Sequence, residues 1–242
     1  ALIVCSAEAA ETAGVARDRW LFPHSGTDGA DTNFVSNRAD LHSSPAIRVA
    51  GRKAMELAGV TPDDIDHVDL YSCFPSAVQI AATEMELGID RQLTQTGGLT
   101  FAGGPLNNYV THSIATMANV LREDAGTVGL CSANGGYITK HAFGLYSTTP
   151  PSNGFKHQDC QTEIDAFPSV DLDAEHVGSG TIEAYTVMHG ADGPERGLAS
   201  VRTPNGRQWA GTSDLPLMES MMTEEHVGRS VQVLPDFSFE LV

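Results

Sequence analysis

The chain has no long apolar run among its 242 residues. A helix that spans a bilayer needs a run of about 18 or more apolar residues. No basic region precedes the first apolar residues, so a secretory signal peptide is not indicated. These absences predict a cytoplasmic protein that has no membrane partner. The length, with 41% hydrophobic residues, suits one large domain or two modest ones, each with a core.

Cysteine and metal-ligand patterns are also scarce. The four cysteines are Cys5, Cys73, Cys131 and Cys160, and no C-x-x-C pair occurs. Disulfide frameworks belong to small, cysteine-dense secreted domains, so reduced thiols are expected here. The nine histidines form neither H-E-x-x-H nor H-x-x-x-H. No metal site is therefore expected.

Positive charge is in short supply. The chain has 14 Lys and Arg against 31 Asp and Glu, which gives a formal net charge of -17. Such a surface repels polyphosphates and anionic membranes. Non-specific binding to nucleic acid is therefore excluded as a function. The same charge gives no general help to an anionic substrate.

Strands and helices alternate over residues 1–149. The apolar residues 1–6 predict a strand, and since no Met precedes them, the ordered chain is expected to begin inside a fold. Residues 23–43, which are rich in Gly, Asp, Asn and Ser, predict a long loop. A mixed or parallel sheet covered by helices is the α/β fold that this alternation favours. The other expected elements are helices at 44–59, 75–87 and 108–123 and strands at 67–71, 127–131 and 137–147.

The pattern changes at the linker Pro150-Pro151-Ser152-Asn153-Gly154, so a domain boundary is expected between residues 149 and 150. Beyond it, short strands with turn signals predict a small antiparallel β-barrel over residues 150–242, OB-like by strand count. The expected strands are 180–189, 197–203, 206–211 and 231–241, with a short helix at 214–225.

Three segments carry a family resemblance. They are Leu70-Tyr71-Ser72-Cys73-Phe74, Gly97-Gly98 with Gly103-Gly104-Pro105, and Leu130-Cys131-Ser132-Ala133-Asn134-Gly135-Gly136. In order and spacing they resemble the N-E-A-F (or H-D-C-F), G-G…G-H-P and C-x-G-G-G motifs of the thiolase superfamily. Residues 1–149 thus resemble the C-terminal half of a thiolase. The following barrel resembles the extra domain of some actinobacterial thiolase-like proteins.

The resemblance implies a five-layered fold built from two similar halves, and acyl transfer on CoA thioesters as in the acetyl-CoA acetyltransferases of lipid metabolism. CoA would be a substrate, and no cofactor is expected. The family's first half supplies the acyl-accepting cysteine and much of the dimer interface. The partners implied are an acyl-CoA molecule and that N-terminal half, with a homodimer left open.

Two positions depart from the motifs. The histidine of G-H-P falls on Gly104, and the asparagine or histidine of the first motif falls on Tyr71. Glycine has no proton to give or take. The loss of a single oxyanion donor costs on the order of 10²–10³ in rate. Ordinary thiolase turnover is therefore not expected of this sequence.

Three side chains are candidates for catalysis, each with a structural alternative. Cys131 matches the family's acid/base cysteine, but free cysteines are often core residues. His112, on the expected helix, is a candidate to replace the lost histidine, or it is an exposed residue. Tyr71, with Tyr109 or Tyr137, would suit a retro-aldolase acting on acyl-CoA, or it is a packed tyrosine.

Backbone donors are the candidates for substrate binding. Gly103 and Gly104 precede a helix, and Asn134 and Gly135 form a similar turn, so their N–H groups suit an anion or a thioester oxygen. Such loops also occur only to turn the chain. Three functions stay open: an acyl-CoA-binding protein with altered acyltransferase residues, a retro-aldolase, and a non-catalytic scaffold.

Overall fold

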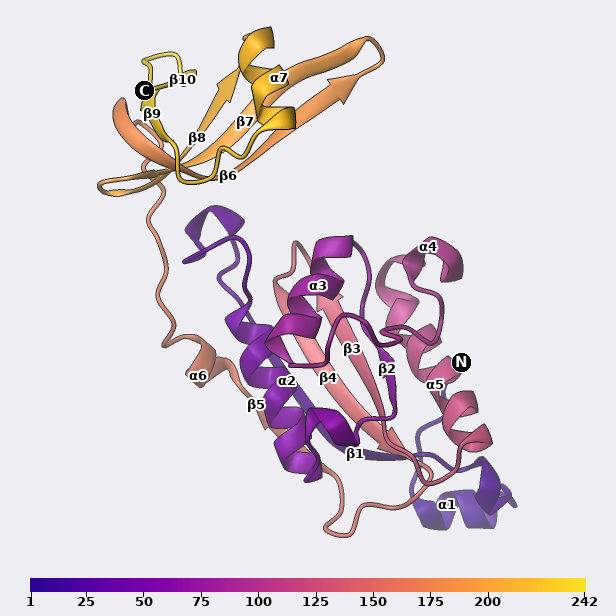
Figure 1. Ribbon diagram of the computed structural model, residues 1–242. Helices are drawn as coiled ribbons and strands as arrows, with labels where there is room; N and C mark the ends of the chain where they lie inside the picture. Colours follow the sequence, from indigo (N-terminus) through magenta and orange to yellow (C-terminus); the bar gives the residue numbers. More distant parts are fainter. The chain divides into compact units, whose positions relative to one another are not determined.

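The computed structural model describes all 242 residues, which pack as two compact units (Figure 1). Unit 1 comprises residues 1–33 and 42–167, and unit 2 comprises residues 34–41 and 168–242. The chain therefore passes from unit 1 to unit 2 between residues 167 and 168. The domain boundary expected between residues 149 and 150 stays a prediction. No helix in the structure combines the length and the apolar character that a bilayer crossing requires.

Unit 1 is built on a mixed five-stranded sheet with the strand order β2-β3-β4-β1-β5. Parallel pairs join β2 to β3 and β1 to β5, while β4 runs antiparallel to both β3 and β1. The expected mixed sheet covered by helices is confirmed. The strands are β1 (Phe22–Ala30), β2 (His67–Asp69), β3 (Gly129–Gly135), β4 (Lys140–Ser147) and β5 (Lys156–Asp159).

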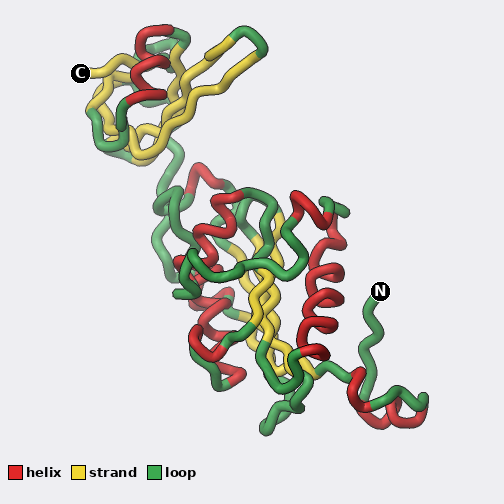
Figure 2. Tube along the Cα trace, turned by 45° about the vertical axis from the view of Figure 1, so that its right-hand side comes forward, coloured by secondary structure: helices red, strands yellow, loops and turns green.

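Helices cover both faces of this sheet, and Figure 2 shows the strands lying between them. Successive residues of a strand point to opposite faces. On β3, Leu130 belongs to the core beneath α2 and α3, while Cys131 packs with Met117 and Leu121 of α5. The helices are α1 (Ala7–Thr12), α2 (Pro45–Ala58), α3 (Pro75–Glu84), α4 (Leu99–Ala102), α5 (Tyr109–Glu123) and α6 (Gln161–Ile164).

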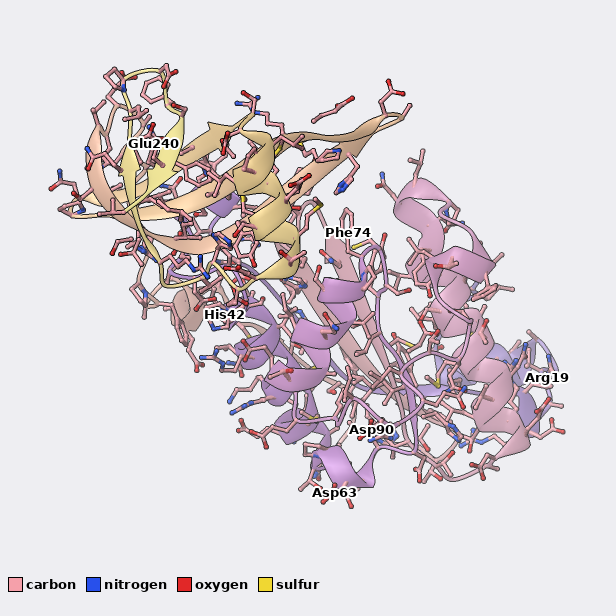
Figure 3. All side chains as sticks on the ribbon, turned by 45° about the horizontal axis from the view of Figure 1, so that its top comes forward. Arg19, His42, Asp63, Phe74, Asp90 and Glu240 are labelled. Atoms are coloured by element: carbon pink, nitrogen blue, oxygen red, sulfur yellow. The ribbon has the colours of Figure 1, made fainter.

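Helix α2 follows its sequence signals closely. The Ser44 hydroxyl caps it by accepting the N–H of Ile47 at 3.1 Å, and Pro45 occupies the first helical position. Gly59 ends the helix in the left-handed region at φ 74°, where a side chain would be disfavoured. Polar side chains such as those of Asp63 and Asp90 line the surface of the unit (Figure 3).

Two expectations for the N-terminal part are wrong. Residues 1–6 form no strand, and the first strand is β1, which lies, except for Phe22, in the segment 23–43 that was expected to be a loop. Strand β1 is rich in polar residues and glycine, yet it is paired on both edges. Its buried hydroxyls are satisfied by α2, because Ser25 donates to the carbonyl of Ala54 and Thr27 to that of Ala50, each at 2.7 Å. Hydrogen-bonded polar groups can be buried without a large penalty.

Unit 2 contains a five-stranded antiparallel sheet with the order β10-β9-β6-β7-β8. The expected barrel is corrected: the ladder does not close, and a single bridge from Gly211 to Ser238 links β8 to the residue before β10. The expected strand 231–241 is divided into two. The elements are β6 (Gly178–Gly190), β7 (Gly193–Thr203), β8 (Gly206–Thr212), α7 (Leu215–Thr223), β9 (Ser230–Val233) and β10 (Phe239–Leu241).

A buried arginine organises unit 2. The Arg207 side chain is fully buried, and its Nε donates to the Glu183 carboxylate. Its Nη1 donates to the carbonyls of Ser36 and Arg38, each at 2.8 Å. Residues 34–41, which lie between β1 and α2 in the sequence, therefore pack as part of this unit.

Candidate functional site

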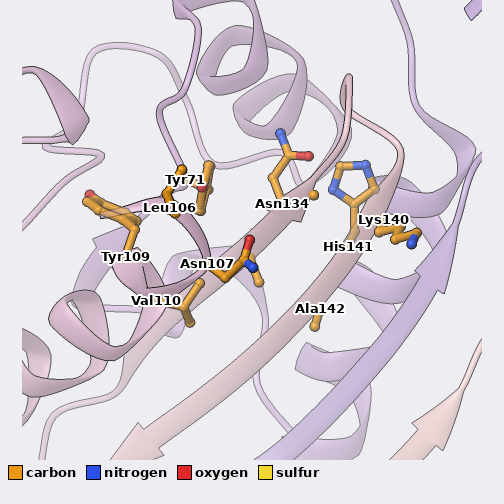
Figure 4. A pocket seen from close by; sticks show the side chains of 11 residues that line it. Tyr71, Leu106, Asn107, Tyr109, Val110, Asn134, Lys140, His141 and Ala142 are labelled. Atoms are coloured by element: carbon orange, nitrogen blue, oxygen red, sulfur yellow. The ribbon is translucent and has the colours of Figure 1, made fainter. Parts of the chain in front are cut away.

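A cavity of about 300 Å³ opens beside the ends of β2 and β3 in unit 1 (Figure 4). Three stretches of chain supply its walls: Tyr71 after β2, residues from 106 to 110 at the start of α5, and residues from 133 to 142 in the β3–β4 hairpin. The lining residues are Tyr71, Leu106, Asn107, Tyr109, Val110, Ala133, Asn134, Gly135, Lys140, His141 and Ala142.

A buried carboxylate holds the loop next to the pocket. Asp69 at the end of β2 is fully buried and accepts the N–H groups of Gln95 at 2.8 Å and Thr96 at 2.9 Å. The Thr96 hydroxyl lies 2.6 Å from the hydroxyl of Tyr109 and accepts the N–H of Gly98 at 3.1 Å. The Gly97-Gly98 turn is thereby tied to β2 and to the first residue of α5.

Tyr71 lies in the pocket wall, where the family motif indicated a functional residue. Its ring meets Tyr109 edge to face, with centroids 5.1 Å apart, and its N–H donates to the Ser132 hydroxyl at 2.9 Å. Burial, and then the proximity of Cys73, raise the pKa of the Tyr71 phenol above its ordinary value. The phenol is therefore protonated at neutral pH and acts as a hydrogen-bond donor.

Cys131 lies in the core and not among the residues that line the pocket. Its side chain is 3% exposed, and burial raises its pKa to about 12. A thiol with that pKa carries almost no thiolate at neutral pH, and thiolate is the form that acts as a base. This position favours the structural alternative for Cys131.

The remaining predicted residues divide into two groups. Asn134 and Gly135 line the pocket, and the amide of Asn134 donates to the Cys73 sulfur at 3.4 Å. Gly103 and Gly104 are exposed and do not line it, although the loop that they begin continues directly into Leu106 and Asn107, which do. His112 on α5 and Tyr137 in the β3–β4 turn are exposed and lie outside the lining.

Sequence reasoning missed Lys140, which lines the pocket together with Asn107 and His141. The buried His141 has its Nε2 3.8 Å from a carboxylate oxygen of Asp31. A signal for Lys140 existed in the hairpin, because residues that flank a tight turn face each other across the strands. Lys140 does pair with Gly135, which was already a candidate.

Comparison with known proteins identifies both parts of the chain. Residues 27–89 match the family model described as thiolase C-terminal domain-like. Residues 159–237 match the thiolase-like protein type 1 additional C-terminal domain. The chain carries a thiolase-like C-terminal domain followed by the additional domain of thiolase-like protein type 1.

One solved structure and two curated enzymes are similar to this thiolase-like chain. The crystal structure of a monomeric SCP2-thiolase like protein type 1 from Mycobacterium smegmatis superposes with a TM-score of 0.87 at 35% identity, over 98% of this chain and 54% of that one. An acetyl-CoA acetyltransferase from Methanocaldococcus jannaschii is 34% identical over 74 residues, which are 31% of this chain and 19% of that protein. A 3-ketoacyl-CoA thiolase from a Marinomonas species is 37% identical over 87 residues, 34% of this chain and 22% of the relative.

The thiolase-like chain thus covers only a part of each relative's length, 19% and 22% of the two curated enzymes and 54% of the M. smegmatis protein. The geometry of the pocket is the better guide to function.

Proposed function

We propose that this chain, joined to a thiolase N-terminal half, binds acyl-CoA thioesters in the pocket beside Tyr71 and does not turn them over at ordinary thiolase rates. One observation carries the proposal. Two of the three segments that resemble thiolase motifs, far apart in the sequence, line this cavity: the first with Tyr71 and the third with Asn134 and Gly135. The residues directly after the second segment, Leu106 and Asn107, line it as well.

The chemistry of the lining supports binding over thiolysis. Tyr71 and the amides of Asn107 and Asn134 offer neutral hydrogen-bond donors, which suit a thioester carbonyl. The acid/base positions of the family are filled differently, because Gly104 has no side chain and the Cys131 thiol has a pKa raised to about 12. Such a pocket offers donors to a thioester carbonyl but lacks the acid/base groups at the two positions that the family uses.

The test uses the chain with an N-terminal half restored. Titration calorimetry with acetyl-CoA and acetoacetyl-CoA measures binding, and loss of thioester absorbance in the presence of CoA measures turnover. We expect binding without thiolase-level turnover, and weaker binding in Asn134→Ala. Asn153→Ala, at an exposed linker position, is the matched control. Ordinary turnover, or no binding by the wild-type protein, would contradict the proposal.

A retro-aldol cleavage of an acyl-CoA substrate is the second candidate, and the placement of Tyr71 favours it. The phenol reaches the pocket in its protonated form, as a donor to a developing oxyanion must. This reaction releases an aldehyde or ketone and needs no acyl-enzyme adduct. Product analysis by mass spectrometry should find the carbonyl product with the wild-type protein and much less with Tyr71→Phe. Binding without any product would identify a non-catalytic scaffold.

A further inference from the structure

The pocket contains a single permanently charged side chain. Lys140 lines it, and no Asp or Glu does. The chain as a whole has a formal net charge of -17, so a pocket that holds a cation without an acid beside it differs from the average surface. The local charge favours a ligand with an anionic group at that end of the cavity.

The position of Lys140 follows from the hairpin. Lys140 is the first residue of β4 and pairs with Gly135 at the end of β3. A Cβ built on Gly135 would lie 3.6 Å from the Cβ and 4.0 Å from the Cδ of Lys140, so the lysine stem lies across the glycine. The stem therefore lies over the backbone of Gly135, and Lys140 is an exposed residue that lines the pocket.

The ammonium group has no protein carboxylate to neutralise it. No Asp or Glu oxygen lies within the 4.0 Å that defines an ion pair with Lys140, whereas Lys53 on α2 pairs with Glu56 at 2.5 Å. An unpaired cation at a pocket edge is available to a ligand without first breaking an internal ion pair. Lys140 is therefore available to an incoming anion, with an attraction that solvent screens.

The lining also changes character from one end to the other (Figure 4). Tyr71, Tyr109 and Leu106 lie at the end away from Lys140, and Asn107, Asn134 and His141 lie between. A ligand laid along the cavity would meet apolar contacts, then amide groups and the His141 ring, then the lysine. The volume of about 300 Å³ is at the lower limit of small-molecule pockets and matches a short chain better than a nucleotide.

We propose that the pocket prefers acyl thioesters whose acyl chain ends in a carboxylate, which pairs with Lys140. This inference rests on the proposed binding of acyl-CoA. The anion could in principle belong to the acyl end or to a phosphate of CoA, and the two sources differ in one measurable respect. A carboxylate contact depends on the acyl group, while a phosphate contact is the same for every CoA ester.

The experiment compares adipyl-CoA with hexanoyl-CoA, which have equal chain lengths and the same CoA moiety. Affinities are measured by calorimetry for the wild-type protein with an N-terminal half restored, for Lys140→Met, and for the control Lys156→Met on the exposed strand β5. We expect the wild-type protein and the control to bind adipyl-CoA about threefold to fivefold more tightly, as an ion pair at a solvent-facing edge provides. Lys140→Met should remove that preference, so that the two esters bind with equal affinity. Added salt should reduce the preference.

Each other outcome overturns the inference in a recognisable way. Equal affinity of the wild-type protein for both esters would show that the pocket does not read the acyl terminus, and the proposed acyl-CoA binding would still stand. An equal loss for both esters in Lys140→Met would assign the lysine to a CoA phosphate. Failure of either ester to bind the wild-type protein would overturn the proposed function itself.

Discussion

The two units use buried charge in opposite ways to hold irregular backbone. In unit 1 the Asp69 carboxylate gathers the N–H groups of Gln95 and Thr96. In unit 2 the Arg207 guanidinium gathers the carbonyls of Ser36 and Arg38. Each charge thus supplies what a loop outside regular pairing leaves unsatisfied, acceptors in one case and donors in the other.

The two buried charges differ in whether a side chain of opposite charge accompanies them. Arg207 is accompanied by Glu183, whose carboxylate it contacts through Nε. Burial raises the pKa of Glu183, but the hydrogen bonds from Arg207 and Ser200 and the charges of Arg207 and Arg202 outweigh it, so the net pKa is lowered. Asp69 has no cationic partner and relies on N–H and hydroxyl donors. The buried ion pair is the more sensitive arrangement, because removal of Arg207 leaves Glu183 with only the partly exposed Arg202 as a cationic partner.

The largest effect is therefore expected at Arg207. Arg207→Met leaves Glu183 half-buried without its closest cation and frees the carbonyls of residues 36 and 38, so unfolding free energy should fall by about 3–5 kcal/mol. Urea unfolding followed by Trp209 fluorescence, in a Trp20→Phe background, measures unit 2 alone. Arg196→Met, at an exposed position on β7, is the control and should change little. A loss of unfolding free energy no larger than that of the control would contradict the expected role of Arg207.

A smaller effect is expected at Asp69. Asp69→Asn keeps the shape but places an amide NH₂ near backbone N–H donors, so stability should fall by about 1–3 kcal/mol. Urea unfolding followed by Trp20 fluorescence, in a Trp209→Phe background, measures unit 1. Asp90→Asn, exposed at the surface, is the matched control (Figure 3). Equal stability of the two variants would mean that the loop 94–98 is held by other contacts.

Cys131 differs from Asp69 and Arg207, because it is a buried ionisable group that stays neutral. Burial raises its pKa from 9.0 to about 12, so the folded protein keeps a proton that the unfolded chain loses. Its contribution to stability is complete below pH 9 and is lost as the pH rises towards 12. Thermal unfolding between about pH 8 and 11 should show a steeper alkaline decline for the wild-type protein than for Cys131→Ala. Cys5→Ala, at an exposed cysteine, should keep the wild-type slope.

Local signals in the sequence predicted the elements that local contacts build. Helix α2 was found because Ser44, Pro45 and Gly59 act within a few residues of its two ends. Strand β1 was missed because its inward Ser25 and Thr27 look like loop residues until the α2 carbonyls that accept their hydrogen bonds are known. The expected barrel failed for a related reason, since strand count does not determine whether the edge strands pair.

The residues of the candidate site show the same division between local signals and contacts that are distant in the sequence. Tyr71 and Asn134 were predicted because they fall in motifs, and both line the pocket. Lys140 was missed because its role depends on the cross-strand pairing with Gly135. Cys131 matched a motif by spacing, but the alternation of β3 turns its side chain into the core beneath α5. A spacing match carries no information about which face of a strand a residue occupies.

The membership of residues 34–41 in unit 2 has a consequence for synthesis of the chain. These residues are translated before residues 42–167 of unit 1, whereas Arg207 and the rest of β8 follow only after all of unit 1 has been translated. During that interval the carbonyls of Ser36 and Arg38 are without the guanidinium that they meet in the finished fold. The connection between β1 and α2 thus meets these partners only after the rest of unit 1 has been made.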